Sequence, residues 1–392
     1  MARKGLALDT TRDFLRIYVL WAPDSEESHR IAEFLVTHFD GLGMERDGVA
    51  IRVPVRFRSK PWVEADRLPR EIDFEGAEHN AVVLLYDPLM AEDKFLWDAY
   101  VTAIRGKISA RNNVDIYVPF GSPERDAALP FDLASHTQYA RRDRWREVLK
   151  ERADRDNRLL LHLLLSVRQH LKRIYAPSSP DEPLFVSHAK ADGDKTARAI
   201  VDYVNDTQND VPLETFYDAM ELLPGEDYEL RFESEINKGT LLAITSDAYD
   251  SRPWCVFELT TAKRAYRPIV VADVATVKTS RTYPYGANLP KVRVAVGDNS
   301  AWIEKLLVET LSEGLRCDLF TAQARKRAVQ AGLSAIITPR PPELFDLTVG
   351  DGLASTLIYP DPPIGKIESE ILEKALTSSG RKLDLKTLSE VR

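Results

Sequence analysis

A carboxylate and a large aromatic ring in the second half of the chain have the spacing that places two side chains on one face of a helix. Trp254 and Glu258 are four residues apart, so on a helix their side chains lie one turn from each other. A carboxylate beside an aromatic ring in a partly apolar pocket is a candidate functional group. The plainer alternative is that Glu258 is a solvated helix residue and Trp254 a core residue.

Polar side chains follow three predicted strands of the same region, at the points where the strands end. They are Ser187 and His188 after the first strand, Tyr217 and Asp218 after the second, and Thr245 and Ser246 after the third. In a doubly wound parallel sheet these ends meet at one edge, where ligands bind. We therefore expect a cleft there, with Lys190 nearby, although Ser187, His188 and Lys190 could instead cap the first helix.

Short apolar strands alternate with helical segments through this region. The predicted strands are 184–187, 211–217, 241–245 and 267–274, and the predicted helices are 195–204, 228–237 and 256–266. An earlier region repeats the alternation, with predicted strands at 15–21, 49–57, 81–86 and 114–119, a stretch with helical spacing at 31–39 and a helical segment at 95–104. Such alternation is typical of parallel sheets covered by helices on both faces.

The sequence thus predicts an α/β protein with flavodoxin-like parallel sheets, built from two similar units and a C-terminal extension. Residues 1–140 form the first unit, and residues 141–180 form a connector that contains a long helix and ends in a Pro/Ser-rich linker. Residues 181–290 form the second unit. Residues 291–392 form the extension, with a strand at 292–296, a helix near 302–311 and Pro-rich segments.

Composition excludes several classes of protein. The 61 acidic residues exceed the 53 basic ones, which argues against a protein whose main partner is nucleic acid. Two cysteines cannot build a disulfide framework or a Cys-rich metal site, and no apolar run is long enough to span a membrane. We expect a cytoplasmic protein without a membrane partner.

Most familiar catalytic patterns are absent from the sequence. It has no Gly-rich dinucleotide loop, no phosphate-binding P-loop, no Gly-x-Ser-x-Gly elbow and no HExxH pair. We therefore predict neither a metal site nor a bound cofactor. Cys255 is expected to be a small buried residue, because no histidine lies in an obvious position to activate it.

Three segments of the second unit stand out in order: FVSHAKADGD at the first strand and its loop, TFYDAMELLPGEDY at the second strand and its loop, and SDAYDSRPWCVFEL after the third strand. Together, over about residues 181–274, they resemble a Toll/interleukin-1 receptor (TIR) domain. The second segment is in the place of the family's BB loop, and the third is similar to the family's Ser-x-Trp-Cys-x-x-Glu-Leu region. Each segment alone is a weak signal, whereas their order is fairly specific.

The resemblance implies an activity and the residues that carry it. In enzymatic TIR domains a Glu at the position of Glu258 is catalytic in cleaving the nicotinamide–ribose bond of NAD+, which is the substrate and no cofactor. The resemblance implies that the product is linear or cyclic ADP-ribose, that self-association through TIR domains activates the enzyme, and that an activator protein or ligand could be the trigger. Bacterial members act in antiphage defence. The substrate-binding candidates are Ser187, His188, Lys190, Asp218, Leu223, Pro224, Gly225, Ser246 and Trp254.

Two other functions fit the same sequence. Many TIR domains are scaffolds that only pair with other TIR domains, and a third possibility is a sensor that binds a nucleotide without turnover. The first unit lacks the Trp-Cys-x-x-Glu segment, and its nearest carboxylate is Asp98 beside Trp97. We interpret that unit either as a degenerate, non-catalytic TIR-like domain or as an unrelated α/β domain.

Overall fold

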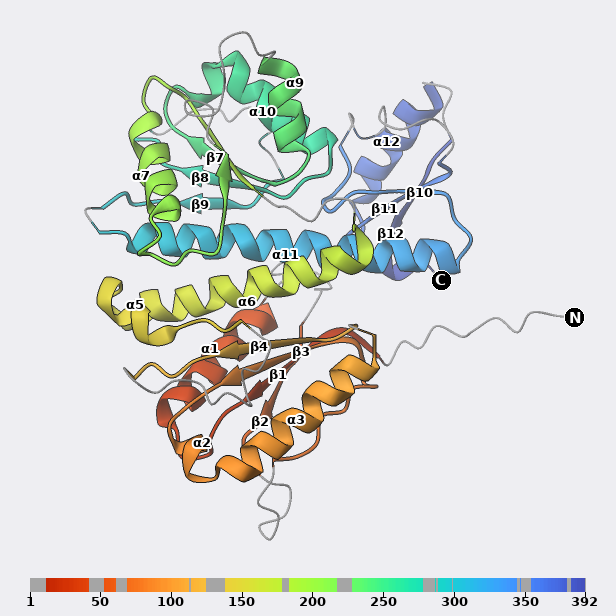
Figure 1. Cartoon of the computed structure of the whole chain (residues 1–392). Coiled ribbons are helices and arrows are strands. Elements are labelled where there is room, and N and C mark those ends of the chain that lie inside the picture. Colours follow the sequence, from red (N-terminus) through yellow and green to blue (C-terminus); the bar gives the residue numbers. More distant parts are fainter. Residues whose placement is uncertain are drawn as a thin grey trace, which may run out of the picture. The chain divides into compact units, whose positions relative to one another are not determined.

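The computed structural model describes residues 12–41, 53–60, 69–112, 114–124, 138–177, 183–216, 228–277, 286, 288–297, 299–343, 346, 354–378 and 382–391. Within these ranges the chain forms three all-parallel sheets of four, five and three strands, flanked by helices (Figure 1). The predicted α/β class is confirmed. Of the described residues, 12–159 form one compact unit, here unit 1, and 160–391 form a second, unit 2.

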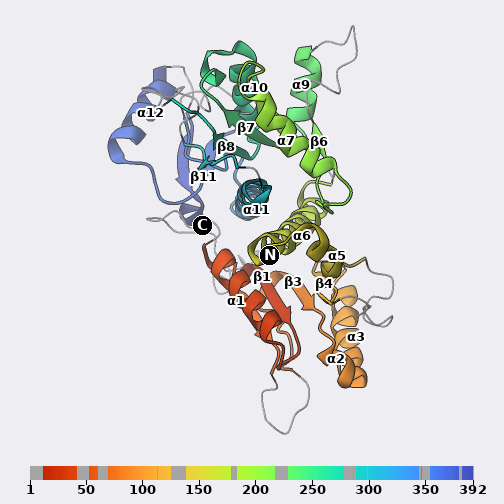
Figure 2. The same ribbon diagram turned by 90° about the vertical axis from the view of Figure 1, so that its left-hand side faces the viewer.

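Unit 1 contains the four-stranded sheet, in the order β2-β1-β3-β4. Its strands are β1 (Asp13–Leu20), β2 (Val55–Arg58), β3 (Ala77–Leu85) and β4 (Ile116–Phe120). Helix α1 (Glu26–Gly41) connects β1 to β2, while α2 (Leu89–Glu92) and α3 (Lys94–Ala110) connect β3 to β4. The two connections run in opposite directions along the sheet, and right-handed crossovers therefore place α1 and α3 on opposite faces (Figure 2).

The predicted connector helix is interrupted. It consists of α5 (Arg142–Val148) and α6 (Arg152–Tyr175), separated by residues 149–151, of which Leu149 is extended. No Gly or Pro causes the break. Instead, the buried guanidinium of Arg142 donates to the carbonyls of Gly121 at 2.6 Å and Tyr86 at 2.9 Å, so α5 is held against the ends of β3 and β4.

Unit 2 contains the five-stranded sheet, in the order β6-β5-β7-β8-β9. Its strands are β5 (Leu184–His188), β6 (Thr215–Phe216), β7 (Thr240–Thr245), β8 (Ile269–Asp273) and β9 (Lys291–Arg293). This is the 2-1-3-4-5 order of flavodoxin-like folds. The strand at 291–293, which from the sequence is expected to belong to the C-terminal extension, pairs with β8 and completes this sheet.

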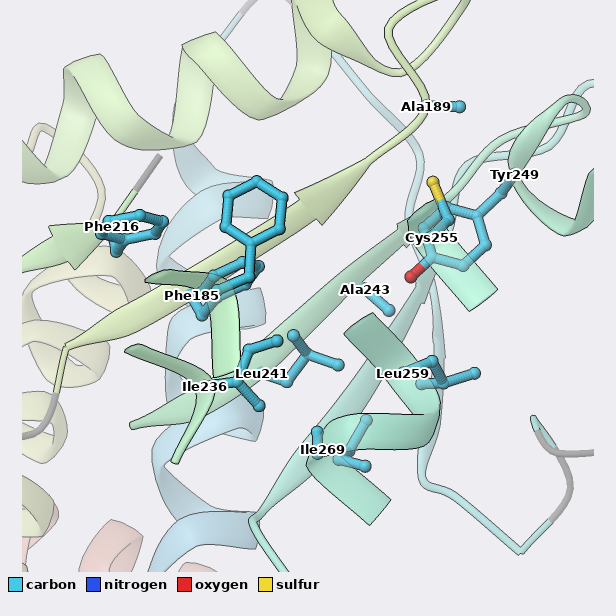
Figure 3. Close-up of a cluster of buried hydrophobic side chains, with 12 residues drawn as sticks. Phe185, Ala189, Phe216, Ile236, Leu241, Ala243, Tyr249, Cys255, Leu259 and Ile269 are labelled. Carbon is cyan, nitrogen blue, oxygen red and sulfur yellow. The ribbon is translucent and has the colours of Figure 1, made fainter. Parts of the chain in front are cut away.

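Three helices with apolar faces lie between these strands. Helix α7 (Asp194–Asn205) follows β5, α9 (Tyr228–Ile236) precedes β7, and α10 (Pro253–Arg264) connects β7 to β8 after a short 3-10 turn, η1 (Tyr249–Ser251). All three helices overlap the ranges that the sequence predicts. Residues contributed by β5, β7, α9 and α10 pack together in one apolar cluster (Figure 3).

The C-terminal part of unit 2 consists of one long helix and the three-stranded sheet. Helix α11 (Ala301–Gln330) continues far beyond the predicted 302–311 and lies beside α6 in both Figure 1 and Figure 2. The sheet is β10 (Ala335–Ile337), β11 (Thr356–Tyr359) and β12 (Asp384–Thr387), with α12 (Lys366–Ser378) packed on it and a closing 3-10 turn, η4 (Leu388–Glu390). Across the described ranges, no helix has both the length and the apolarity needed to cross a bilayer.

Helix α11 contains a glycine, Gly314, although glycine usually weakens helices, and the packing against α6 explains why. A methyl group at this position would overlap the guanidinium of Arg168, which is buried between the helices and pairs with Asp318 at 2.9 Å. The glycine therefore allows the α6 side chain to cross close to the α11 backbone.

We predict opposite effects for two helical glycine substitutions. Gly314→Ala should destabilise the protein by about 1–3 kcal/mol, because the buried guanidinium has to move. Gly106→Ala in α3 has open space around the added methyl group and should stabilise the protein by about 0.5–1 kcal/mol through helix propensity. Urea unfolding of both variants tests the pair, and a stabilised Gly314→Ala would contradict the close packing described above.

We also predict that His38, in the last turn of α1, makes unit 1 sensitive to acid. Burial lowers the pKa of His38 to about 4. Unfolding restores a pKa near the ordinary value of about 6.5, so between these values only the unfolded chain binds the proton and stability falls as the pH falls. From pH 7 to pH 5, wild type should lose up to about 2 kcal/mol more than His38→Gln. Hydrogen exchange in unit 1 measures this loss, and equal losses would rule the effect out.

Candidate functional site

The N-terminal half of α10 packs against the carboxyl end of β5, the central strand of the candidate site. Cys255, in the first turn of α10, donates through its thiol to the carbonyl of His188 at 3.4 Å. Cys255 is buried, as the sequence predicts, and lies in the apolar cluster with Phe185 and Leu259 (Figure 3). This contact places α10 across the edge where β5 ends.

Glu258 lies one turn after Trp254 on α10 and is almost completely buried, with 6% of its surface exposed. The solvated-helix interpretation of Glu258 is therefore wrong. Moving an ionised carboxylate out of water costs several kcal/mol unless nearby polar groups compensate. An uncharged residue at position 258 would thus be buried at a lower cost in stability than Glu258 is.

Tyr249, which sequence reasoning missed as a site residue, lies close to Glu258. Burial holds the pKa of the Tyr249 phenol well above 10, and the charge of the Glu258 carboxylate raises that pKa further. The phenol therefore stays protonated at physiological pH. Its oxygen is 2.7 Å from the hydroxyl of Ser187, at the end of β5, and the two hydroxyls share a hydrogen bond.

Asp192 ties together two of the loops at this edge. Its carboxylate accepts hydrogen bonds from the hydroxyl of Ser246 and, at 2.9 Å, from the backbone amide of Ala248. Asp192 belongs to the loop after β5, whereas Ser246 and Ala248 follow β7. The structure thus brings Ser187 and Ser246 to the same edge of the sheet, as their places at strand ends predict.

Trp254 is not a core residue, because 47% of its surface is exposed. Its ring makes edge-to-face contacts with Phe232 of α9, at a centroid distance of 6.1 Å, and with Phe257, at 5.7 Å. An exposed aromatic ring supported by two others can stack on a planar ligand. Its exposure contrasts with the burial of Ser187, Tyr249 and Glu258.

The other predicted binding residues have separate positions. His188 is buried, and its Nε2 lies 3.6 Å from the carboxylate of Asp194, so its side chain contacts the start of α7. Lys190 is exposed in the loop after β5. Asp218, Leu223, Pro224 and Gly225 lie outside the described residues. Over the described ranges, no group of three or more His, Cys, Asp or Glu side chains is placed to hold a metal ion.

The far end of α10 is held by the C-terminal extension. The side chain of Lys263 is fully buried and pairs with Glu343 at 2.6 Å, and the guanidinium of Arg340 donates to the Lys263 carbonyl. Burial lowers the pKa of Lys263, while the Glu343 carboxylate opposes that shift. The Glu343–Lys263 pair spans 80 residues, and no local pattern in the sequence predicts it.

Tyr249 and Asp192 could have been found from the sequence in part. Both lie inside the segments that resemble the TIR family, in FVSHAKADGD and SDAYDS. Their roles depend on side chains from different loops meeting, which strand ends alone do not predict.

Comparison with models of known protein families gives no match for this chain, and no curated protein matches it.

We predict that Ser187 and Tyr249 are energetically coupled. Ser187→Ala and Tyr249→Phe should each destabilise the protein, and the double variant should lose about 1 kcal/mol less than the sum of the two. Urea unfolding of the four proteins of this cycle gives the coupling energy. Strictly additive losses would show that the 2.7 Å hydrogen bond contributes nothing to stability.

Proposed function

We propose that unit 2 contains a TIR domain that cleaves the nicotinamide–ribose bond of NAD+, with Glu258 as its catalytic carboxylate. One observation carries this proposal: a buried carboxylate beside a protonated phenol, at the edge where β5 and β7 end. The flavodoxin-like strand order adds support, because such sheets bind ligands at this edge. A cytoplasmic location and a role in bacterial antiphage defence are part of the proposal.

The chemistry suits a carboxylate without help from a cofactor. When the bond between ribose C1′ and the nicotinamide nitrogen breaks, its electron pair leaves with neutral nicotinamide and the ribose becomes oxocarbenium-like. The charge of Glu258 stabilises that cation, as glycosidase carboxylates do. Water then attacks C1′ and releases a proton, which gives ADP-ribose, or the adenine of the same molecule attacks and gives a cyclic product.

Only 6% of the surface of Glu258 is exposed, so the proposed reaction includes a step that opens access to its carboxylate. An enzyme that opens this position only when TIR domains associate would be silent when dilute, which suits a toxic activity. We therefore propose self-association as the activating step, with an activator protein or ligand as its possible trigger.

The same burial favours a second candidate function, a non-enzymatic TIR scaffold. In that case Glu258 is a structural residue that supports Tyr249 and the loops after β5 and β7. The two functions differ in what they require of the charge. A scaffold needs the shape and hydrogen bonds of residue 258, whereas bond cleavage needs its negative charge.

We predict that Glu258→Gln, which keeps the shape but removes the charge, lowers nicotinamide release at least about 100-fold. The experiment measures nicotinamide from NAD+ by proton NMR over a range of concentrations of the full chain. Release per molecule of wild type should rise with protein concentration. Glu233→Gln, an exposed carboxylate of α9, is the matched control and should behave as wild type.

Two results would contradict the proposed function. Equal release by wild type and by folded Glu258→Gln would remove the residue from the mechanism. No release from wild type in a sample shown to be assembled by light scattering would favour the scaffold. Circular dichroism of each variant separates loss of chemistry from loss of fold.

A further inference from the structure

Unit 1 contains a cavity of about 650 Å³ at the carboxyl ends of β1 and β2. The chain leaves β1 through Trp21 and turns at Pro23 to Ser25 into α1, while β2 ends at Arg58 and continues into Ser59 and Lys60. All lining residues belong to unit 1. The volume is in the range of pockets that hold drug-sized ligands.

One wall of this cavity is aromatic. The rings of Trp21 and Phe57 meet edge to face with centroids 5.0 Å apart, and His29 of α1 lies 5.7 Å from Trp21 and 6.4 Å from Phe57. Trp21 is buried, whereas Phe57 is 38% exposed and His29 is exposed. Phe57 and His29 therefore offer ring surface to a planar ligand, with Trp21 fixing Phe57 from behind.

A second wall carries positive charge. The amide of Arg70 donates to the carbonyl of Lys60 at 3.4 Å, which places these two exposed cations next to each other in the backbone. Arg58 is buried, with its guanidinium 4.7 Å from the centre of the Tyr18 ring. Lysine and arginine side chains converging on a cavity are typical of phosphate binding.

Ser59 provides an independent sign of a missing ligand. The residue is 6% exposed and lines the cavity, and among the described residues its hydroxyl has no hydrogen-bond partner. Buried hydroxyl groups are nearly always hydrogen-bonded in folded proteins. A ligand with polar atoms in the cavity would satisfy this hydroxyl.

We propose that this cavity of unit 1 binds a nucleotide. Its base stacks on Phe57 and His29, its phosphates meet Lys60 and Arg70, and Asp24 and Glu26 in the turn after β1 supply acceptors for ribose hydroxyls. An inorganic anion would leave the aromatic wall unused, and an uncharged aromatic compound would leave the cations unused. Only a ligand with both parts uses the whole cavity.

The test measures binding to the full chain by calorimetry with ADP, GDP, CDP, UDP, adenosine and pyrophosphate. We expect at least one diphosphate to bind more tightly than adenosine or pyrophosphate. Phe57→Ala should weaken that nucleotide about tenfold or more and leave pyrophosphate unchanged. The double variant Lys60→Glu/Arg70→Glu should weaken the binding of the nucleotide and of pyrophosphate and leave the binding of adenosine unchanged. High salt should likewise weaken the binding of the two charged ligands to wild type.

The control is Lys94→Glu, an exposed cation of α3 outside the cavity, which should bind as wild type. Absence of saturable binding by all four diphosphates would overturn the proposal. Binding that the Phe57 and Lys60/Arg70 variants leave unchanged would place the nucleotide elsewhere and also overturn it. The substituted side chains are partly or fully exposed, so these variants should fold, and circular dichroism checks that they do.

Discussion

The position of α10 is the constraint on which the candidate site depends. The thiol of Cys255 and, in the turn just before the helix, the hydroxyl of Tyr249 hold its beginning against β5. The buried Lys263–Glu343 pair holds its end against the C-terminal extension. Glu258 lies between these two anchors. Because both ends are tied, the helix keeps a carboxylate out of water at a place where a freely moving helix would turn it toward solvent.

Buried ionic and polar groups recur at the contacts between the elements of unit 2. Arg168 pairs with Asp318 across α6 and α11, and the hydroxyl of Tyr203 in α7 donates to the fully buried Glu304 of α11. Buried ion pairs contribute little net stability, yet removing one partner is costly, so such pairs hold a particular packing in place. Helix α11 is thereby fixed along its length by specific polar contacts as well as by apolar burial.

The two units share the strand order 2-1-3-4 and differ in the chemistry at the carboxyl edge of the sheet. In unit 1 this edge carries an aromatic and cationic cavity, and in unit 2 it carries a buried carboxylate with two hydroxyls. Asp98 of unit 1 pairs with Lys94 on its own helix at 3.8 Å. Burial raises the pKa of the Tyr86 phenol, and the charges of Asp87 and Asp98 raise it further. One sheet architecture thus presents two different sets of side chains at this edge, and it is these residues rather than the fold that any function depends on.

Local patterns in the sequence determined most of the secondary structure and the α/β class, because short apolar strands and amphipathic helices are recognisable from the spacing of apolar residues over a short stretch. The strand ends correctly placed Ser187 and Ser246 at one edge. The tertiary structure alone decided the burial of Glu258 and its proximity to Tyr249, the exposure of Trp254, the break before α6 and the course of α11 through Gly314. Each of these depends on contacts between residues distant in the chain, such as Arg142 with Tyr86 and Arg168 with Gly314. A local pattern does not predict which distant residue a given side chain contacts.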